Sequence, residues 1–129
     1  MLYPQHRVPL RYRALRYEAA GETPAMTTEH LLEKIKSRLA VAHGARLRGV
    51  VLYGSQARGD AEDGSDIDVM VVLKGVVSPC EEIERTGEDV ARISLDNNVV
   101  VCCVFMSEDR YAYERSPLLL NVRREGIAI

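Results

Sequence analysis

The segment GVVLYGSQARGDAEDGSDIDVMVVL, residues 49–73, places a polar, glycine-rich stretch between two apolar runs. The runs Gly49–Tyr53 and Ile67–Leu73 are short and contain almost no polar residue, which predicts two buried strands. The first strand is expected to end at Gly54, and the second to begin just after Asp66. The side chains able to carry chemistry therefore stand between two neighbouring strands.

Helical periodicity accounts for much of the remaining chain. Ser78-Pro79-Cys80-Glu81 has the pattern of a capping box with proline at the first helical position, and Gly44 and Gly126 are typical helix stops. Together with the spacing of the apolar residues, these signals predict four helices, over residues 28–43, 78–97, 107–113 and 116–126.

A third apolar run, Val99–Phe105, predicts a strand buried on both faces. The predicted order is helix, strand, glycine-rich loop, strand, helix and strand, followed by the last two helices. This order is typical of an α/β domain with a small mixed β-sheet backed by helices.

The domain is expected to occupy residues 27–129, after a loosely structured extension over residues 1–26 that prolines and a glycine interrupt. The whole chain has 129 residues, of which 47% are hydrophobic and 28% charged. These are ordinary globular values, and they exclude wholesale disorder or a fibrous repeat.

The composition also favours one compartment. The chain has no run of about 18 apolar residues, and arginines interrupt its opening segment, so neither a transmembrane helix nor a secretory signal is expected. Three cysteines make an odd count that fits free thiols in a reducing environment. A net charge of -2 provides no overall attraction to nucleic acid or anionic lipid. We therefore expect a cytoplasmic protein whose phosphate binding, if any, is local.

Gly54 and Ser55 form a turn with little side-chain bulk at the end of a strand. Such a turn lets backbone N–H groups approach an anion, for which phosphate oxygens are the natural occupant. A short helix begun at Gln56 would direct its positive dipole end to the same place, and Arg58 would add a charge-assisted bond. A Gly-Ser pair after a strand is also common as a plain turn, so the pair alone leaves both interpretations open.

Asp66 and Asp68 stand two positions apart at the start of the second strand, so both carboxylates project from one face, about 6.6 Å apart. Mg²⁺ prefers one or two carboxylates together with substrate phosphates, so an adjacent triphosphate would complete its coordination. The alternative is a pair of solvated turn residues. A calcium loop is excluded because Val71 occupies the closing acidic position.

Two neighbouring segments together resemble the signature of the polymerase-β-like nucleotidyltransferases. They are Gly54-Ser55-Gln56-Ala57-Arg58-Gly59 and Ser65-Asp66-Ile67-Asp68-Val69. Within them it is similar to the minimal nucleotidyltransferases that accompany HEPN-domain partners, and the resemblance covers about residues 28–126. It implies a palm-like fold with a small mixed sheet. It also implies roles for individual residues: Gly54, Ser55, Arg58 and Ser65 bind the nucleotide, and Asp66 and Asp68 are catalytic and hold two Mg²⁺ ions.

The function implied by this resemblance is a magnesium-dependent transfer of a nucleoside monophosphate from a nucleoside triphosphate, such as ATP, to an acceptor hydroxyl. One such acceptor is a HEPN-type partner protein, which would be adenylylated. The family's third carboxylate lies on the later strand, where Val99–Phe105 contains no acid. Asp96, Glu108 and Asp109, near its ends, are the candidates for that role. The alternative function is therefore a weak or inactive nucleotidyltransferase-like antitoxin or binding module.

Other residues suggest packing or association. Cys102 and Cys103 point to opposite faces of their strand and are expected to pack in the core, whereas the histidines are expected at the surface. Tyr111, Tyr113 and the run Leu118–Leu120 are interpreted mainly as core, with a homo-oligomer or partner interface as the alternative. Neither a membrane nor a nucleic-acid partner is indicated.

Overall fold

The computed structural model describes residues 27–59, 61 and 66–129, and the structural statements below concern these residues. The expected extension over residues 1–26 lies outside them and stays a prediction. The elements in chain order are α1 (Thr28–His43), the 3-10 helix η2 (Gly44–Arg46), β1 (Leu47–Tyr53), α2 (Ser55–Arg58), β2 (Ile67–Leu73), α3 (Pro79–Asp96), β3 (Val101–Ser107), α4 (Glu108–Tyr113), α5 (Pro117–Glu125) and β4 (Ile127–Ala128).

The sheet is mixed, as the element order predicted. Its strands lie in the order β3-β2-β1-β4, and β1 is antiparallel to both of its neighbours. β2 and β3 are parallel, and the chain between them forms the crossover helix α3 that a parallel pair requires.

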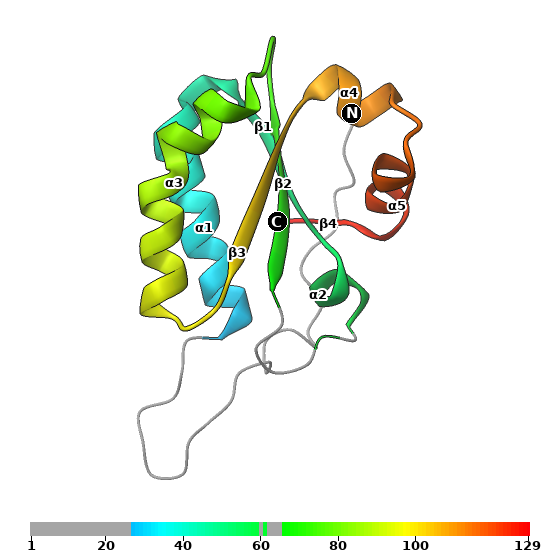
Figure 1. Ribbon diagram of the computed structural model, residues 1–129. Coiled ribbons are helices and arrows are strands. Elements are labelled where there is room, and N and C mark those ends of the chain that lie inside the picture. The colour runs from blue at the N-terminus through cyan, green and yellow to red at the C-terminus, as the bar shows by residue number, and fades with distance from the viewer. Residues whose placement is uncertain (1–26, 60, 62–65) are drawn as a thin grey trace, which may run out of the picture.

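Helices cover both faces of this sheet (Figure 1). On one face α1 and α3 pack against alternate strand residues, including Leu52, Val69 and Phe105. On the other face α4 and α5 cover Met70 and Val72. Because side chains alternate along a strand, β1, β2 and β3 each contribute to two separate cores.

The helix ends agree with the sequence in part. The hydroxyl groups of Thr27, Ser107 and Ser116 each accept a hydrogen bond from the backbone N–H three residues later, at 3.2–3.3 Å. Ser78 precedes α3 without such a bond, so the predicted capping box is wrong, although Pro79 does occupy the first turn. A proline at that position begins the helix because its fixed backbone angle is already helical.

The third strand differs from the prediction in its range and in its burial. β3 spans Val101–Ser107 rather than residues 99–105, and it lies at the edge of the sheet. Cys102, Cys103 and Val104 are accordingly half-buried. The strand buried on both faces is β2, because it lies inside the sheet and helices pack over each of its faces.

A buried ionic cluster joins the end of α1 to the start of α3. The side chain of Glu82 is only 2% exposed, and its carboxylate lies 3.0 Å from Arg46, 3.2 Å from Arg85 and 3.4 Å from Nδ1 of His43. Burial lowers the pKa of His43, and the charge of Glu82 opposes this shift. The expectation that the histidines lie at the surface is therefore wrong for His43.

None of the described helices is long and apolar enough to cross a membrane. The predicted packing of the C-terminal apolar residues is confirmed for Tyr111 and Leu119, which are fully buried. Tyr113, Leu118 and Leu120 remain exposed on α4 and α5, where the alternative of an interface still applies.

Candidate active site

The glycine-serine turn lies where β1 ends and the single turn of α2 begins. Gly54 adopts φ 76° and ψ -156°, a region that side chains with a Cβ rarely enter. The N–H of Arg58 donates to the Gly54 carbonyl at 3.1 Å, and the N–H of Gly59 donates to the Ser55 carbonyl at 3.0 Å. The short helix expected after the turn is confirmed, and Ser55 stands at its first position.

Gly54 also faces the aspartate pair directly. A Cβ added to Gly54 would lie 2.6 Å from Oδ2 of Asp68, well inside van der Waals contact. Cross-strand pairing produces this approach, because Tyr53 at the end of β1 is directly opposite Asp68 in β2. The glycine-serine turn and the aspartate pair therefore meet at one place. A side chain at position 54 is disfavoured by the positive φ of the backbone and by the nearby Asp68 carboxylate.

Asp66 and Asp68 concentrate negative charge at the start of β2. Asp66 precedes the strand and is exposed, whereas Asp68 is its second residue and is half-buried. Burial is the main cause that raises the pKa of Asp68, and the charge of Asp66 adds to it. Arg58 opposes the rise. A cation bound between these two carboxylates would relieve the same repulsion.

Arg58 lies on the α2 side of this charge. Its guanidinium is 3.6 Å from a carboxylate oxygen of Glu125, the last residue of α5, and both side chains are partly exposed. Arg58 thus lies near Asp68 and also contacts Glu125 of α5. A phosphate bound at the turn would compete with the Glu125 carboxylate for the Arg58 guanidinium. Ser65, which the resemblance also assigns to nucleotide binding, lies outside the described residues.

Two residues at the site had not been identified from the sequence. Tyr53 and Cys102 are the direct neighbours of Asp68 on β1 and β3, so the three side chains form a row on one face of the sheet. Asp68 contributes to raising the pKa of both Tyr53 and Cys102, after burial as the first cause. The expectation of core packing holds for Cys103, whose pKa burial raises to about 12, but Cys102 faces the aspartates.

The register of β3 against β2 places Glu108 and Asp109 far from the aspartate pair. Glu108 and Asp109 follow Ser107, which is level with Leu73 at the far end of the sheet. Ser107 is itself about 16 Å along the strand from the level of Asp68, so both acids lie beyond that distance. Glu108 is paired with Arg48 at 3.6 Å.

Asp96 ends α3, which packs on the face opposite to Asp68. In the described part of the chain, no three His, Cys, Asp or Glu side chains come close enough to hold a metal ion together. Cys102 thus occupies the place on β3 beside Asp68, and none of the three candidate acids joins the pair.

The comparison with known families agrees with this geometry. A family model of the nucleotidyltransferase domain matches residues 31–117, which include the turn, both aspartates and most of the sheet. The chain belongs to the nucleotidyltransferase domain family.

Several individual relatives were found. "Putative protein adenylyltransferase MJ0141" of Methanocaldococcus jannaschii is 27% identical over 71 residues, which are 55% of this chain and 71% of the relative. A crystal structure of a "putative nucleotidyltransferase" from Sulfolobus solfataricus has a TM-score of 0.50 and 22% identity, over 77% of this chain and 78% of that one. A toxin-antitoxin structure with AMP-PNP has a TM-score of 0.53 and 20% identity, over 74% and 69%. At these identities the two structures support the fold.

Proposed function

We propose that this protein transfers a nucleoside monophosphate from a nucleoside triphosphate, with ATP as the simplest donor, to an acceptor hydroxyl in a magnesium-dependent reaction. The observation that carries the proposal is the direct approach of Gly54 to the carboxylate of Asp68. This approach brings a turn suited to phosphate and a pair of carboxylates suited to a cation into one site.

The donor set fits Mg²⁺. Asp66 and Asp68 offer carboxylate oxygens, which are the ligands that this ion prefers, and the exposure of Asp66 leaves room for water and for phosphate oxygens. Bound Mg²⁺ would stabilise the negative charge that develops on the transferring phosphoryl group. The ionised form of Asp68 is the one that binds a cation, so we expect binding to weaken as Asp68 is protonated.

The remaining groups orient the nucleotide. The turn at Gly54 and Ser55 would hold the phosphates through backbone N–H groups and the Ser55 hydroxyl. Arg58 would bind a phosphate oxygen in exchange for part of its contact with Glu125. Holding the triphosphate against the aspartate pair accounts for most of what a protein contributes to phosphoryl transfer, which depends on positioning and charge.

We further propose that the acceptor is a hydroxyl group of a partner protein. One relative is named as a protein adenylyltransferase, and others are toxin-antitoxin structures, one of them with AMP-PNP. A HEPN-type toxin modified by this chain as its antitoxin, in the cytoplasm, would combine both features.

A second candidate function is supported by Cys102. It stands beside Asp68 on β3, where a carboxylate would have strengthened cation binding. A site with two carboxylates can bind a nucleotide and its ion yet transfer poorly, which would make the protein a binding module that acts by contact.

The test is incubation of the full chain with labelled ATP and Mg²⁺, with and without the protein encoded by the neighbouring gene, followed by mass analysis for added nucleotide. We expect slow transfer without the partner and faster transfer with it. The matched control is Asp66→Asn combined with Asp68→Asn, which keeps the shape and removes the charge. Tight ATP binding without transfer under either condition would favour the binding module, and absence of both would refute the proposal.

A further inference from the structure

Glu125 places an additional carboxylate next to the candidate active site, on the side of Arg58. It is the last residue of α5, and its Oε2 lies 3.6 Å from Nη1 of Arg58. Its other carboxylate oxygen, Oε1, lies 3.3 Å from Nη2 of Arg124. In the proposed transfer Arg58 binds a phosphate oxygen, so the effect of Glu125 on nucleotide binding depends on this contact.

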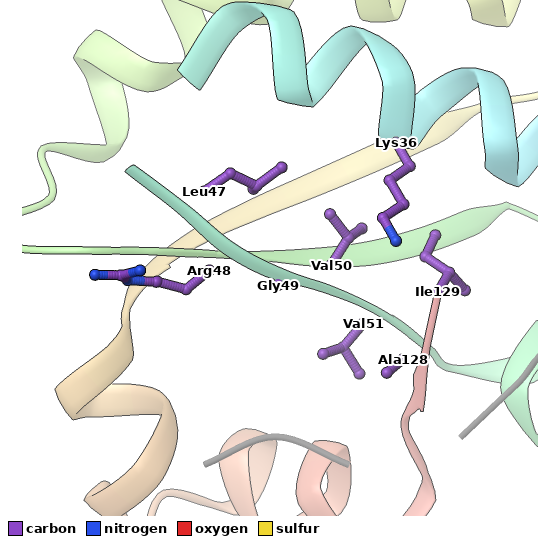
Figure 2. Close-up of a pocket in the computed structure, with 8 residues that line it drawn as sticks. All are labelled: Lys36, Leu47, Arg48, Gly49, Val50, Val51, Ala128 and Ile129. Carbon is purple, nitrogen blue, oxygen red and sulfur yellow. The ribbon is translucent and has the colours of Figure 1, made fainter. Parts of the chain in front are cut away.

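The backbone is anchored on both sides of Glu125. Before it, the Arg123 guanidinium donates two hydrogen bonds to carbonyl oxygens in and just after α4, each at 2.5 Å. After it, Gly126 packs closely on β1, since a Cβ added there would lie 2.6 Å from Cγ1 of Val51. β4 then pairs with β1, and Figure 2 shows Ala128 beside Val51. The end of α5 therefore holds the Glu125 carboxylate beside Arg58.

The contact between Arg58 and Glu125 is electrostatic rather than directional. At 3.6 Å it is longer than a hydrogen bond, so Glu125 does not fix the orientation of the guanidinium. The two side chains are 46% and 32% exposed, so the pair is weak and Arg58 can exchange this carboxylate for another anion. Loss of Glu125 would therefore change the charge around Arg58 more than its placement.

The charge of Glu125 opposes a phosphate at the turn in two ways. A phosphate oxygen must compete with this carboxylate for the Arg58 guanidinium. It is also repelled by the carboxylate, because ATP with one bound Mg²⁺ keeps a net negative charge. Arg58 acts on Asp68 as well, since its charge opposes the rise in the pKa of that carboxyl. Phosphate, Asp68 and Glu125 thus all compete for the positive charge of Arg58.

We propose that Glu125 is an intramolecular competitor of the nucleotide, which occupies part of the Arg58 guanidinium until phosphate displaces it and so lowers the affinity for the triphosphate. This role of Glu125 rests on the proposed function, since it takes the turn at Gly54 as the phosphate site. A lowered affinity shortens the time for which the nucleotide and the pyrophosphate product stay bound.

The experiment measures ATP binding to the full chain by calorimetry in the presence of Mg²⁺. Glu125→Gln keeps the size and a hydrogen-bond acceptor but removes the charge, and we expect it to bind ATP about two- to fivefold more tightly. Glu125→Ala, which also removes the acceptor, should bind at least as tightly as the wild type. The matched control is Glu88→Gln on α3, where the carboxylate is 91% exposed and pairs with Arg92 at 3.9 Å. It changes the net charge equally and should leave the affinity unchanged.

A double-mutant cycle with Arg58→Gln tests whether the effect passes through Arg58. In the Arg58→Gln protein, the further change Glu125→Gln should raise the affinity less than it does in the wild type. An equal gain with and without Arg58, an equal gain in Glu88→Gln, or no gain in Glu125→Gln would overturn the competitor role while the proposed transfer stands. Weaker binding in Glu125→Ala alone would overturn it too, and would make Glu125 a positioning residue for Arg58. Absence of ATP binding in the wild type and in every variant would instead refute the proposed function, and the role of Glu125 with it.

Discussion

Replacing Gly54 by alanine tests the geometry of the candidate site most directly. The added Cβ would lie 2.6 Å from Oδ2 of Asp68, whereas ordinary contact begins at 3.4 Å, so the carboxylate must move by about 0.8 Å. The backbone at φ 76° adds strain of about 1–3 kcal/mol. A misplacement near 1 Å at a catalytic group costs about 100-fold in rate, so we expect a loss of that order in transfer and a clear loss of Mg²⁺-dependent ATP binding.

The matched control is Gly75→Ala. Gly75 also has a positive φ, 82°, but an added Cβ there meets nothing within 4 Å. Urea unfolding followed by circular dichroism should show that both variants lose about 1–3 kcal/mol of stability. Calorimetry with ATP and Mg²⁺ should show a binding defect in Gly54→Ala alone. A folded Gly54→Ala protein with wild-type affinity, or an equal defect in Gly75→Ala, would refute the reasoning.

Four further changes have defined outcomes. Asp68→Asn should abolish Mg²⁺-dependent ATP binding in calorimetry. Because burial raises the pKa of Asp68, the same change should stabilise the metal-free fold at neutral pH, and this gain should shrink as the pH falls through that pKa. Cys102→Asp should strengthen Mg²⁺ binding roughly tenfold by adding a carboxylate level with Asp68, and Cys102→Asn, which adds no charge, should not. Glu82→Ala should cost about 2 kcal/mol in urea unfolding, because it removes the buried carboxylate that Arg46 and Arg85 contact, while both arginines keep partial access to solvent. The pKa of His43 is lowered from 6.5, so below pH 6.5 the unfolded chain binds a proton that the folded chain does not, and stability should fall. His43→Gln removes this effect, so its urea midpoints at about pH 7.5 and 5.5 should differ less than those of the wild type.

The elements near the site could be predicted because their signals are local. The apolar runs on either side of the glycine-rich stretch became β1 and β2, and the helical spacing after Thr28 became α1 with the predicted ends. Asp66 and Asp68 fall on one face because side chains alternate along any strand, whatever packs against it. The family signature in the same segment agrees with the family that the chain belongs to.

Other features could not be predicted because they depend on strand partners that are distant in sequence. A continuous apolar run such as Val99–Phe105 fits a central strand or an edge strand equally well, and the sheet order places β3 at the edge. β4 has only two residues and exists because β1 offers an edge to Ile127 and Ala128. Length and hydropathy contain no information about such pairings.

The sequence by itself determined the longer helices, the first two strands, and the glycine-serine turn and the aspartate pair as two separate motifs, since each follows from a local pattern. Only the tertiary structure decided what stands beside Asp68. The parallel register of β2 and β3 brings Cys102 next to it and leaves Glu108 at the far end of the sheet, while the antiparallel register of β1 brings Tyr53 and Gly54 to it. Register is set by the packing of whole strands and of the crossover helix between them, so no local pattern specifies which side chains meet across the sheet.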